Sequence, residues 1–127
     1  MNFSKIIIVA LALVAMVMTV AAPVSAHAQI GGNGNVQLGL QVGTQNYGSQ
    51  AIAGNGNGQA IVQLGNKNSA TQTTNGNGNV QGVGQIGTKN YATQSATGNG
   101  NLQVAVQDGT SNTMSQTIAG SSPCGYY

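Results

Sequence analysis

Apolar and polar positions alternate where the repeated part of the chain begins. Val36, Leu38, Leu40 and Val42 are apolar, and the residues between them are Gln, Gly and Gln. Alternation with a period of two indicates a β-strand with two different faces. No window of the repeated region has apolar residues at the 3.6-residue spacing of an amphipathic helix. We therefore expect strands and turns there.

The alternating segment belongs to a repeat without gaps. Asn recurs every 11 residues, and Gly follows each Asn after eight more. The asparagines are Asn35, Asn46, Asn57, Asn68, Asn79, Asn90, Asn101 and Asn112, and the expected turn glycines are Gly43, Gly54, Gly65, Gly76, Gly87, Gly98, Gly109 and Gly120. Each unit has room for one strand of 5–7 residues and one turn, in which Gly supplies left-handed backbone conformations.

Glutamine distinguishes two alternating kinds of unit, so the true period is 22. The first kind carries Gln37, Gln59, Gln81 and Gln103, together with Gln41, Gln63, Gln85 and Gln107. The second kind carries Gln50, Gln72, Gln94 and Gln116. Two strands and two turns in each 22 residues make a β-arch. Four stacked arches predict an all-β fold, a β-solenoid of two parallel, in-register sheets.

The repeats predict four segments of the chain. Residues 35–120 hold the four repeats, and residues 29–34 match the end of a preceding half-unit. Residues 121–127 form a tail, in which Pro123 stands where a ninth Asn would fall and marks the end of the core. The tail could cap the solenoid, contact a partner or be free.

Stacked repeats turn each fixed position into a column of identical side chains. An amide both donates and accepts hydrogen bonds, so a column of amides can satisfy itself when buried and can fix the register. We expect such ladders at the glutamines that begin with Gln41 and Gln50. For Asn35 and its equivalents a ladder and a purely backbone role at turn corners are both open.

The sequence leaves open which face of the first strand is buried. Burial of apolar side chains would turn Val36, Leu38 and their neighbours inward. Asp108 opposes this, because it shares a column with Val42. With the glutamines inside, an apolar stripe on one sheet would promote side-by-side association or contact with surfaces.

The N-terminal segment predicts secretion. Lys5 precedes an apolar run over 6–20, and Ala26, His27 and Ala28 form a small-residue cleavage site. The run is shorter than the ~20 residues of a comfortable membrane span. We expect a signal peptide over 1–28, cut after Ala28.

Charge and reactive groups argue against catalysis. Only Lys67, Lys89 and Asp108 are charged beyond position 28, a net charge of 2 − 1 = +1. No basic patch indicates nucleic acid or an anionic membrane as a partner. His27 lies in the segment to be removed, and Cys124 has no base beside it, so we expect no enzyme, metal, cofactor or small-molecule substrate. Cys124 indicates an intermolecular disulfide, an exposed thiol or a tolerated tail residue.

Four segments resemble the curlin repeat of curli fibre subunits. They have the form Gln-x-Gly-x-x-Asn and begin at Gln41, Gln63, Gln85 and Gln107. Family members carry Ser or Asn six residues before this Gln, and Asn35, Asn57, Asn79 and Asn101 fit. They carry a small residue two after the Asn, which Gly48, Ala70 and Ala92 match and Met114 does not.

The resemblance implies a biofilm-matrix amyloid with Asn and Gln pointing into the arch, exported unfolded through the outer membrane. The partners would be further copies of the chain, a nucleator or co-subunit, and the secretion machinery. Three features depart from the family. The second-arm Gln follows its Asn by four residues rather than six, Gln37 and its equivalents are additional, and the N-terminal secretion-targeting stretch is almost missing.

Two functions from different classes follow. Open sheet edges at both ends of a solenoid template further pairing, so we expect head-to-tail addition into an extracellular fibre that serves adhesion and cell aggregation. The alternative is a soluble solenoid that binds a ligand or ice through outward hydroxyl columns. Their members are Ser49, Thr71, Thr93 and Ser115, with Ala51, Thr73, Ser95 and Thr117 beside them.

Overall fold

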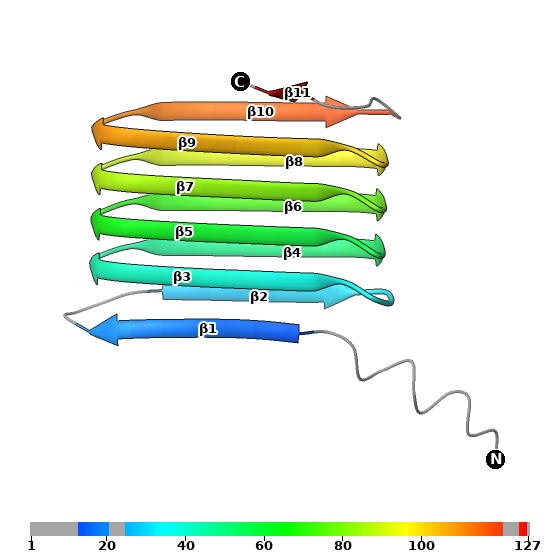
Figure 1. Cartoon of the computed structure of the whole chain (residues 1–127), viewed down its shortest axis with the longest axis horizontal. Coiled ribbons are helices and arrows are strands. Elements are labelled where there is room, and N and C mark those ends of the chain that lie inside the picture. Colours follow the sequence, from blue (N-terminus) through cyan, green and yellow to red (C-terminus); the bar gives the residue numbers. More distant parts are fainter. Residues whose placement is uncertain (1–12, 21–24, 121–124, 127) are drawn as a thin grey trace, which may run out of the picture.

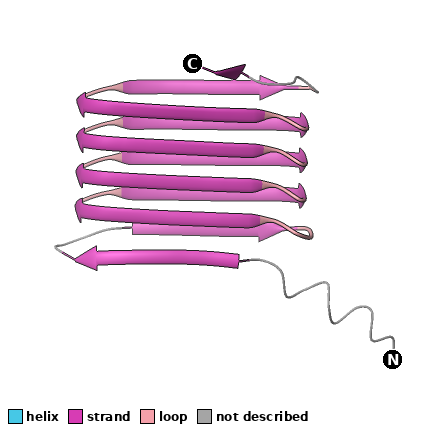
Figure 2. Ribbon diagram, in the orientation of Figure 1, coloured by secondary structure: helices cyan, strands magenta, loops and turns pink. Residues whose placement is uncertain are grey.

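The computed structural model describes residues 13–20, 25–120 and 125–126. Strands stack into a flat coil in which each turn contributes one strand to the front and one to the back (Figure 1). Short loops join them at both edges (Figure 2). The strands are β1 (Leu13–Val20), β2 (Ser25–Gly31), β3 (Val36–Thr44), β4 (Tyr47–Asn55), β5 (Gly58–Asn66), β6 (Ser69–Asn77), β7 (Val80–Thr88), β8 (Tyr91–Asn99), β9 (Leu102–Thr110), β10 (Thr113–Ala119) and β11 (Gly125–Tyr126).

The predicted β-solenoid is confirmed. One sheet, here called sheet A, has the order β1-β3-β5-β7-β9-β11, and sheet B has the order β10-β8-β6-β4-β2. All neighbours are parallel, and residues pair with their equivalents 22 positions on, as Gln41 does with Gln63 and Gln50 with Gln72. We call each pair of strands from β3 and β4 to β9 and β10 a rung, numbered 1 to 4.

The strands are longer than predicted. From β3 to β9 each has nine residues instead of five to seven, and β10 has seven. The ladder continues through the corner glycine, so that Gly43 pairs with Gly65 and Thr44 with Asn66. A corner that repeats in every rung keeps its hydrogen-bond partner above and below, and pairing therefore does not stop where the chain begins to turn.

Each corner contains two residues with positive φ. The turn glycines from Gly43 to Gly120 have φ between 110° and 130°. Two residues later the chain is left-handed again, at Gly34, Gly56, Gly78 and Gly100 on one edge and at Gln45, Lys67, Lys89 and Ser111 on the other. Left-handed conformations are uncommon for residues with a Cβ. The sequence pattern did not reveal this second position, because half of its members are not glycine.

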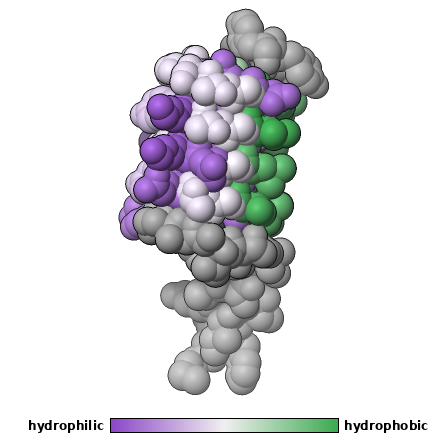
Figure 3. Space-filling view, turned by 90° about the vertical axis from the view of Figure 1, so that its left-hand side faces the viewer, coloured by the Kyte–Doolittle hydropathy of each residue, from purple (hydrophilic) through white to green (hydrophobic). Residues whose placement is uncertain are grey.

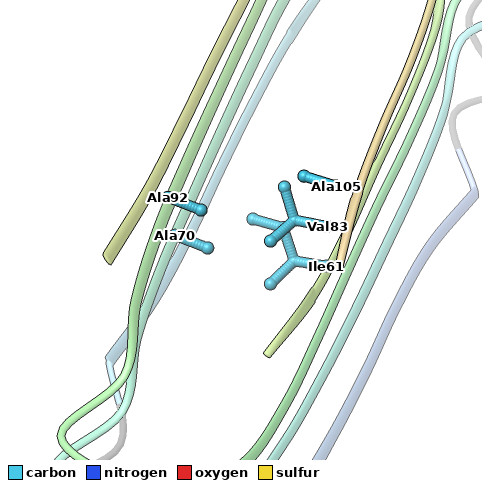
Figure 4. Close-up of a cluster of buried hydrophobic side chains, with 5 residues drawn as sticks. All are labelled: Ile61, Ala70, Val83, Ala92 and Ala105. Atoms are coloured by element: carbon cyan, nitrogen blue, oxygen red, sulfur yellow. The ribbon is translucent and has the colours of Figure 1, made fainter. Parts of the chain in front are cut away.

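A small apolar cluster lies between the sheets. Ile61, Val83 and Ala105 point from sheet A toward Ala70 and Ala92 of sheet B (Figure 4). Met114 packs against this cluster at the C-terminal end and is only partly buried. The cluster occupies one pair of facing inward columns, and amide side chains occupy most of the other inward positions.

Both ends of the solenoid carry additional strands. In sheet A, β1 pairs with β3 at an offset of 23, whereas β2 pairs with β4 at the repeat offset of 22. Strand β1 and residues 25–28 belong to the expected signal peptide. Residues 1–12 and 21–24 of that peptide and residues 121–124, with Pro123 and Cys124, lie outside the described residues. No helix in the described part of the chain is long and apolar enough to cross a bilayer.

The corner geometry predicts very different costs for two glycines that are two residues apart. A Cβ at Gly76 would lie 1.8 Å from the carbonyl oxygen of Gly98, whereas a Cβ at Gly78 would meet no atom within 4 Å. Gly78→Ala should therefore cost only the left-handed penalty of about 1–2 kcal/mol, and Gly76→Ala should prevent the corner from stacking. Urea unfolding followed by circular dichroism tests this pair. Equal losses in both variants would contradict it.

Candidate functional site

The interior between the sheets is lined by amides. Nearly every glutamine in the three columns that begin at Gln37, Gln41 and Gln50 is at most 5% exposed, and Gln116 at the C-terminal end is partly buried. The outward positions of sheet A are apolar instead. Burial of an amide is costly unless it is hydrogen-bonded, so the observed orientation depends on how these amides are paired.

Each glutamine column forms an uninterrupted ladder. The Nε2 of each residue donates to the Oε1 of the residue 22 positions later, over 2.5–3.2 Å. All nine bonds run in the same direction, with donors facing the C-terminal end. The additional glutamines from Gln37 to Gln103 form a complete ladder of their own. Their period of 22 is visible in the sequence, but the ladders predicted from it were those of Gln41 and Gln50.

The same Nε2 groups also connect the two sheets. Gln63 of β5 donates to the carbonyl oxygen of Tyr47 in β4 over 2.9 Å, and Gln85 donates to that of Ser69 over 3.0 Å. Gln50 of β4 donates in return to Leu38 O of β3 over 3.2 Å. Gln59, Gln63 and Gln85 thus use one N–H along the stack and the other across it. Each such bond is worth about 0.5–1.5 kcal/mol net, and a register slip would lose both.

The asparagine columns combine the two roles that the sequence left open. The Nδ2 of Asn57 donates to Asn35 Oδ1 over 3.1 Å and to the corner carbonyl of Gly76 over 2.8 Å. The bonds between side chains in this column run toward the N-terminal end, opposite to the glutamine ladders. In the column from Asn46 to Asn112, each Oδ1 accepts from the backbone N–H of the next asparagine over 3.1–3.2 Å. These residues are therefore both ladder members and turn residues.

Sequence reasoning missed a further ladder on the surface. Asn55 Nδ2 donates to Asn77 Oδ1, and Asn77 Nδ2 donates to Asn99 Oδ1, both over 3.2 Å. At the opposite edge Thr44 Oγ1 donates to Asn66 Oδ1 over 2.6 Å. The signal was present, because Asn recurs at 33, 55, 77 and 99 with the same period of 22.

The ladders end differently at the two ends of the solenoid. The Oε1 atoms of Gln37 and Gln41 are buried and have no hydrogen-bond partner. In β1, which lies beside β3, the residues in register with them are Val14 and Met18, and neither residue type carries an amide. At the other end Gln107 Nε2 donates only to Tyr91 O over 3.0 Å, whereas Gln63 and Gln85 of the same column each make two donations. Unpaired acceptors thus stand at one end and incompletely used donors at the other.

The outer faces of the sheets have opposite character. Hydrophobic residues gather along one side of the solenoid when it is viewed from one edge, along the strands (Figure 3). This side is sheet A, whose exposed members include Val36, Leu38, Val80, Val104 and Val106. The outer face of sheet B carries the predicted columns of Ser and Thr and is at least partly exposed. The two lysines lie side by side at a corner, and Asp108 lies near that edge of β9.

Within the described residues, no group of three His, Cys, Asp or Glu side chains could hold a metal ion. No protein-family model, no curated protein and no solved structure matches the chain.

The ladders predict a pH-dependent stability for one substitution. In Gln85→Glu, a protonated carboxyl keeps both ladder bonds, donating to Gln107 Oε1 and accepting from Gln63 Nε2, and loses the donation to Ser69 O, whereas a carboxylate cannot donate at all. Burial raises the pKa of the introduced carboxyl above its unfolded value of ~4.3. Stability is therefore retained below that unfolded value and lost as the pH rises through the folded pKa. At pH 7 the loss relative to acid pH should approach a limit of about 3.7 kcal/mol, because the folded chain can keep the carboxyl protonated at about 1.36 kcal/mol for each of the roughly 2.7 pH units above ~4.3.

Urea midpoints between pH 3 and pH 8 test this expectation. Thr73→Glu is the matched control, because Thr73 is exposed on the outer face of sheet B, and it should change stability by less than ~0.5 kcal/mol. The same pH profile in both variants would refute the role of the buried ladder.

Proposed function

We propose that this chain is a secreted structural subunit, or the nucleator, of an extracellular amyloid fibre of the curli type. Copies add head to tail, with β9 and β10 of one subunit against β3 and β4 of the next. The fibre supports a biofilm matrix, adhesion and cell aggregation, and the chain has no catalytic role. Its partners are further copies of itself, a nucleator or co-subunit, and secretion machinery in the outer membrane.

The complementary ends of the glutamine ladders carry this proposal. Gln37 and Gln41 present buried, unpaired Oε1 atoms at the N-terminal end. Gln103 and Gln107 are their equivalents at the C-terminal end, where each donates to one carbonyl of sheet B. A second copy placed one strand spacing further on, ~4.8 Å, would bring these donors opposite those acceptors. A contact between unlike ends does not close and therefore gives an open filament.

The small residues of rung 1 fit the same joint. Two inward columns begin with Gly39 and Gly48, and they end with Ala105 and Met114. A Cβ at Gly39 would meet nothing closer than Gln50 Oε1 at 4.0 Å, so the interior has room there. Met114 would lie beside Gly48 of the next copy, where the Gln41 amide occupies the space next to the backbone: a Cβ at Gly48 would be 2.6 Å from Gln41 Nε2. The room in rung 1 is therefore at Gly39, and the flexible side chain of Met114 would have to reach it from the facing column.

The resemblance to the curlin repeat gives independent support. Its Gln and Asn positions are those that form inward ladders here, from Gln41 and Asn46 onward. Secretion rests on the signal peptide expected over 1–28. Its removal would take away β1, which pairs with β3 from Val36 to Gly43, and would leave that edge free for another copy. At the opposite edge the two residues of β11 cover only Gln103 and Val104, and an incoming β3 would displace them.

The fibre is tested with the chain from Gln29 onward, released from denaturant. Thioflavin fluorescence is followed with and without seeds, and electron microscopy examines the end point. We expect unbranched fibres after a lag that seeds abolish. A persistently soluble β-rich monomer would overturn the proposal.

One substitution tests the proposed joint alone. Val36 N–H donates toward the β5 side, to Asn57 O, and successive N–H groups of a parallel strand point to opposite edges. The N–H of Gly39 therefore faces the open edge. Gly39→Pro removes it and should reduce seeded elongation at least tenfold, whereas Gly39→Ala, which keeps the N–H, should elongate like the parent chain. Equal rates for both variants would place the joint elsewhere.

The unprocessed chain should behave differently from the processed one. With β1 on the β3 edge, Val14 and Met18 stand opposite the free acceptors, and growth at that end should be blocked. We expect the full chain to add to seeds at least tenfold more slowly than the chain from Gln29. Protease removal of the leader during the assay should restore the rate, and full elongation with the leader still attached would refute the blocking role.

The outer face of sheet B supports a second candidate function. Its hydroxyl columns run along a flat, regular sheet from Thr71 to Thr93 and from Thr73 to Ser95, and such an array could order water or bind a ligand. Thermal hysteresis of a soluble monomer, abolished by Thr93→Lys, would favour an ice-binding solenoid. Fibres without thermal hysteresis would favour the structural subunit.

A further inference from the structure

The four outward columns along sheet A that begin at Val36, Leu38, Leu40 and Val42 hold only apolar residues and glycine, apart from Asp108. Rung 1 presents Val36, Leu38, Leu40 and Val42, and rung 4 presents Leu102, Val104 and Val106. Val106 is 66% exposed. The charged residues Lys67, Lys89 and Asp108 all lie toward one edge of this sheet, so its centre is uncharged. A flat apolar sheet without covering loops is unusual for a chain that stays alone in water.

This face is ridged as well as apolar. In the two central columns, rungs 1 and 4 carry leucine and valine, rung 3 carries Gly82 and Gly84, and rung 2 carries Ala60 and Val62. A Cβ at Gly82 or Gly84 would be 3.9 Å from the nearest valine methyl group, and neither glycine has a positive φ. These glycines are therefore not needed by the backbone. They leave a shallow hollow in the middle of the face.

We propose that this face binds the same face of a second copy, so that two solenoids pair back to back in a dry interface. Strands of nine residues at ~3.3 Å per residue and four rungs at ~4.8 Å give a face of roughly 19 by 30 Å. Pairing two such faces removes roughly 1,100 Å² from water. This area exceeds the ~1,000 Å² expected of a specific interface, and it is added again with every subunit of a fibre.

The lattice of the face explains why the partner is a second copy. Along the stack its side chains are one strand spacing apart, and along each strand they occur at every second residue. A copy of the same sheet has the same two distances over its whole face. Sheets stacked face to face interdigitate in this way at a separation of ~10 Å. The outer face of sheet B has the same lattice but carries hydroxyl groups, so it offers no equivalent apolar interface.

The ridges also indicate how the two copies are offset. This step rests on the proposed head-to-tail growth, whereas the pairing itself does not. In a filament the bulky rung 4 is followed by the bulky rung 1 of the next copy, and the hollow of rung 3 comes two rungs later. A shift of two rungs, roughly 10 Å, between filaments that run in the same direction places rung 1 of one filament over rung 3 of the other. Gly82 and Gly84 would then receive the leucine side chains of the partner's rung 1.

Two substitutions test the pairing without touching the interior. Val106→Lys puts a charge on the exposed ridge, and Gly84→Val fills the hollow where a side chain has room. Thr117→Lys is the control, because Thr117 is exposed in the same rung on sheet B. Mass per length of the fibres is measured by scanning transmission electron microscopy, and cross-sections are obtained by cryo-electron microscopy. Parent and Thr117→Lys fibres should hold two subunits in each ~19 Å of length, and both sheet A variants should hold one.

The outcomes separate this proposal from fibre formation. Parent fibres with one subunit in each ~19 Å of length would overturn the pairing and leave head-to-tail growth intact. Val106→Lys or Gly84→Val fibres that keep two subunits in that length would have the same consequence. If no fibres form, the oligomeric state of the soluble chain is measured by sedimentation. A parent dimer that becomes monomeric in Val106→Lys supports the pairing, and a monomeric parent chain overturns it. Flotation with phosphatidylcholine vesicles is run in parallel. Binding that Val106→Lys abolishes, together with single filaments, would identify a lipid surface as the occupant and refute the second copy.

Discussion

A buried side-chain amide needs a hydrogen-bond donor for its oxygen and an acceptor for its N–H group. The rest of this structure depends on how that need is met. The solenoid supplies both from the equivalent residues one rung away, as Gln85 does between Gln63 and Gln107. This solution works only if every rung has the same length and the same corner. The gapless 22-residue repeat and the glycines at each corner follow from it, since one inserted residue would turn a whole strand over. Apolar burial, which dominates most domains, has a minor part here.

The same constraint explains the outward apolar face. Once amides occupy the inward positions, the alternation of a strand leaves the other set to solvent, and in sheet A that set is valine, leucine and glycine. The interior then holds only a few apolar residues beside the amides, with Ile61 and Val83 of sheet A against Ala70 and Ala92 of sheet B. A surface of this kind is consistent with a molecule that is completed by association. The ends and one face favour association for different reasons. The ends carry amide groups that lack hydrogen-bond partners, and the face exposes apolar area to water.

Much of the fold could be predicted from the sequence, because a repeat without gaps gives the period, the stacking and the columns together. The ladders of Gln41 and Gln50 follow from chemistry once the columns are known. The buried face could not be predicted from rung 1 alone, where Val36 and Gln37 alternate and either set could be inside. Only hydrogen-bond accounting over all rungs decides it. The left-handed residues at Lys67 and Lys89 also escaped prediction, because a stacked corner imposes a conformation that neither lysine prefers. Strand lengths were underestimated, because pairing between identical corners continues where an isolated strand would end.

The opposite directions of the amide ladders have an electrical consequence. In the glutamine columns each carbonyl points toward the N-terminal end, and these three columns outnumber the one interior asparagine column whose side-chain bonds run the other way. Aligned amide dipoles add along an axis as they do in an α-helix, so a stack of these subunits would carry a permanent dipole that grows with its length. Such a rod has a positive and a negative pole, would orient in an electric field, and would meet a neighbour of reversed polarity more favourably than one of the same polarity.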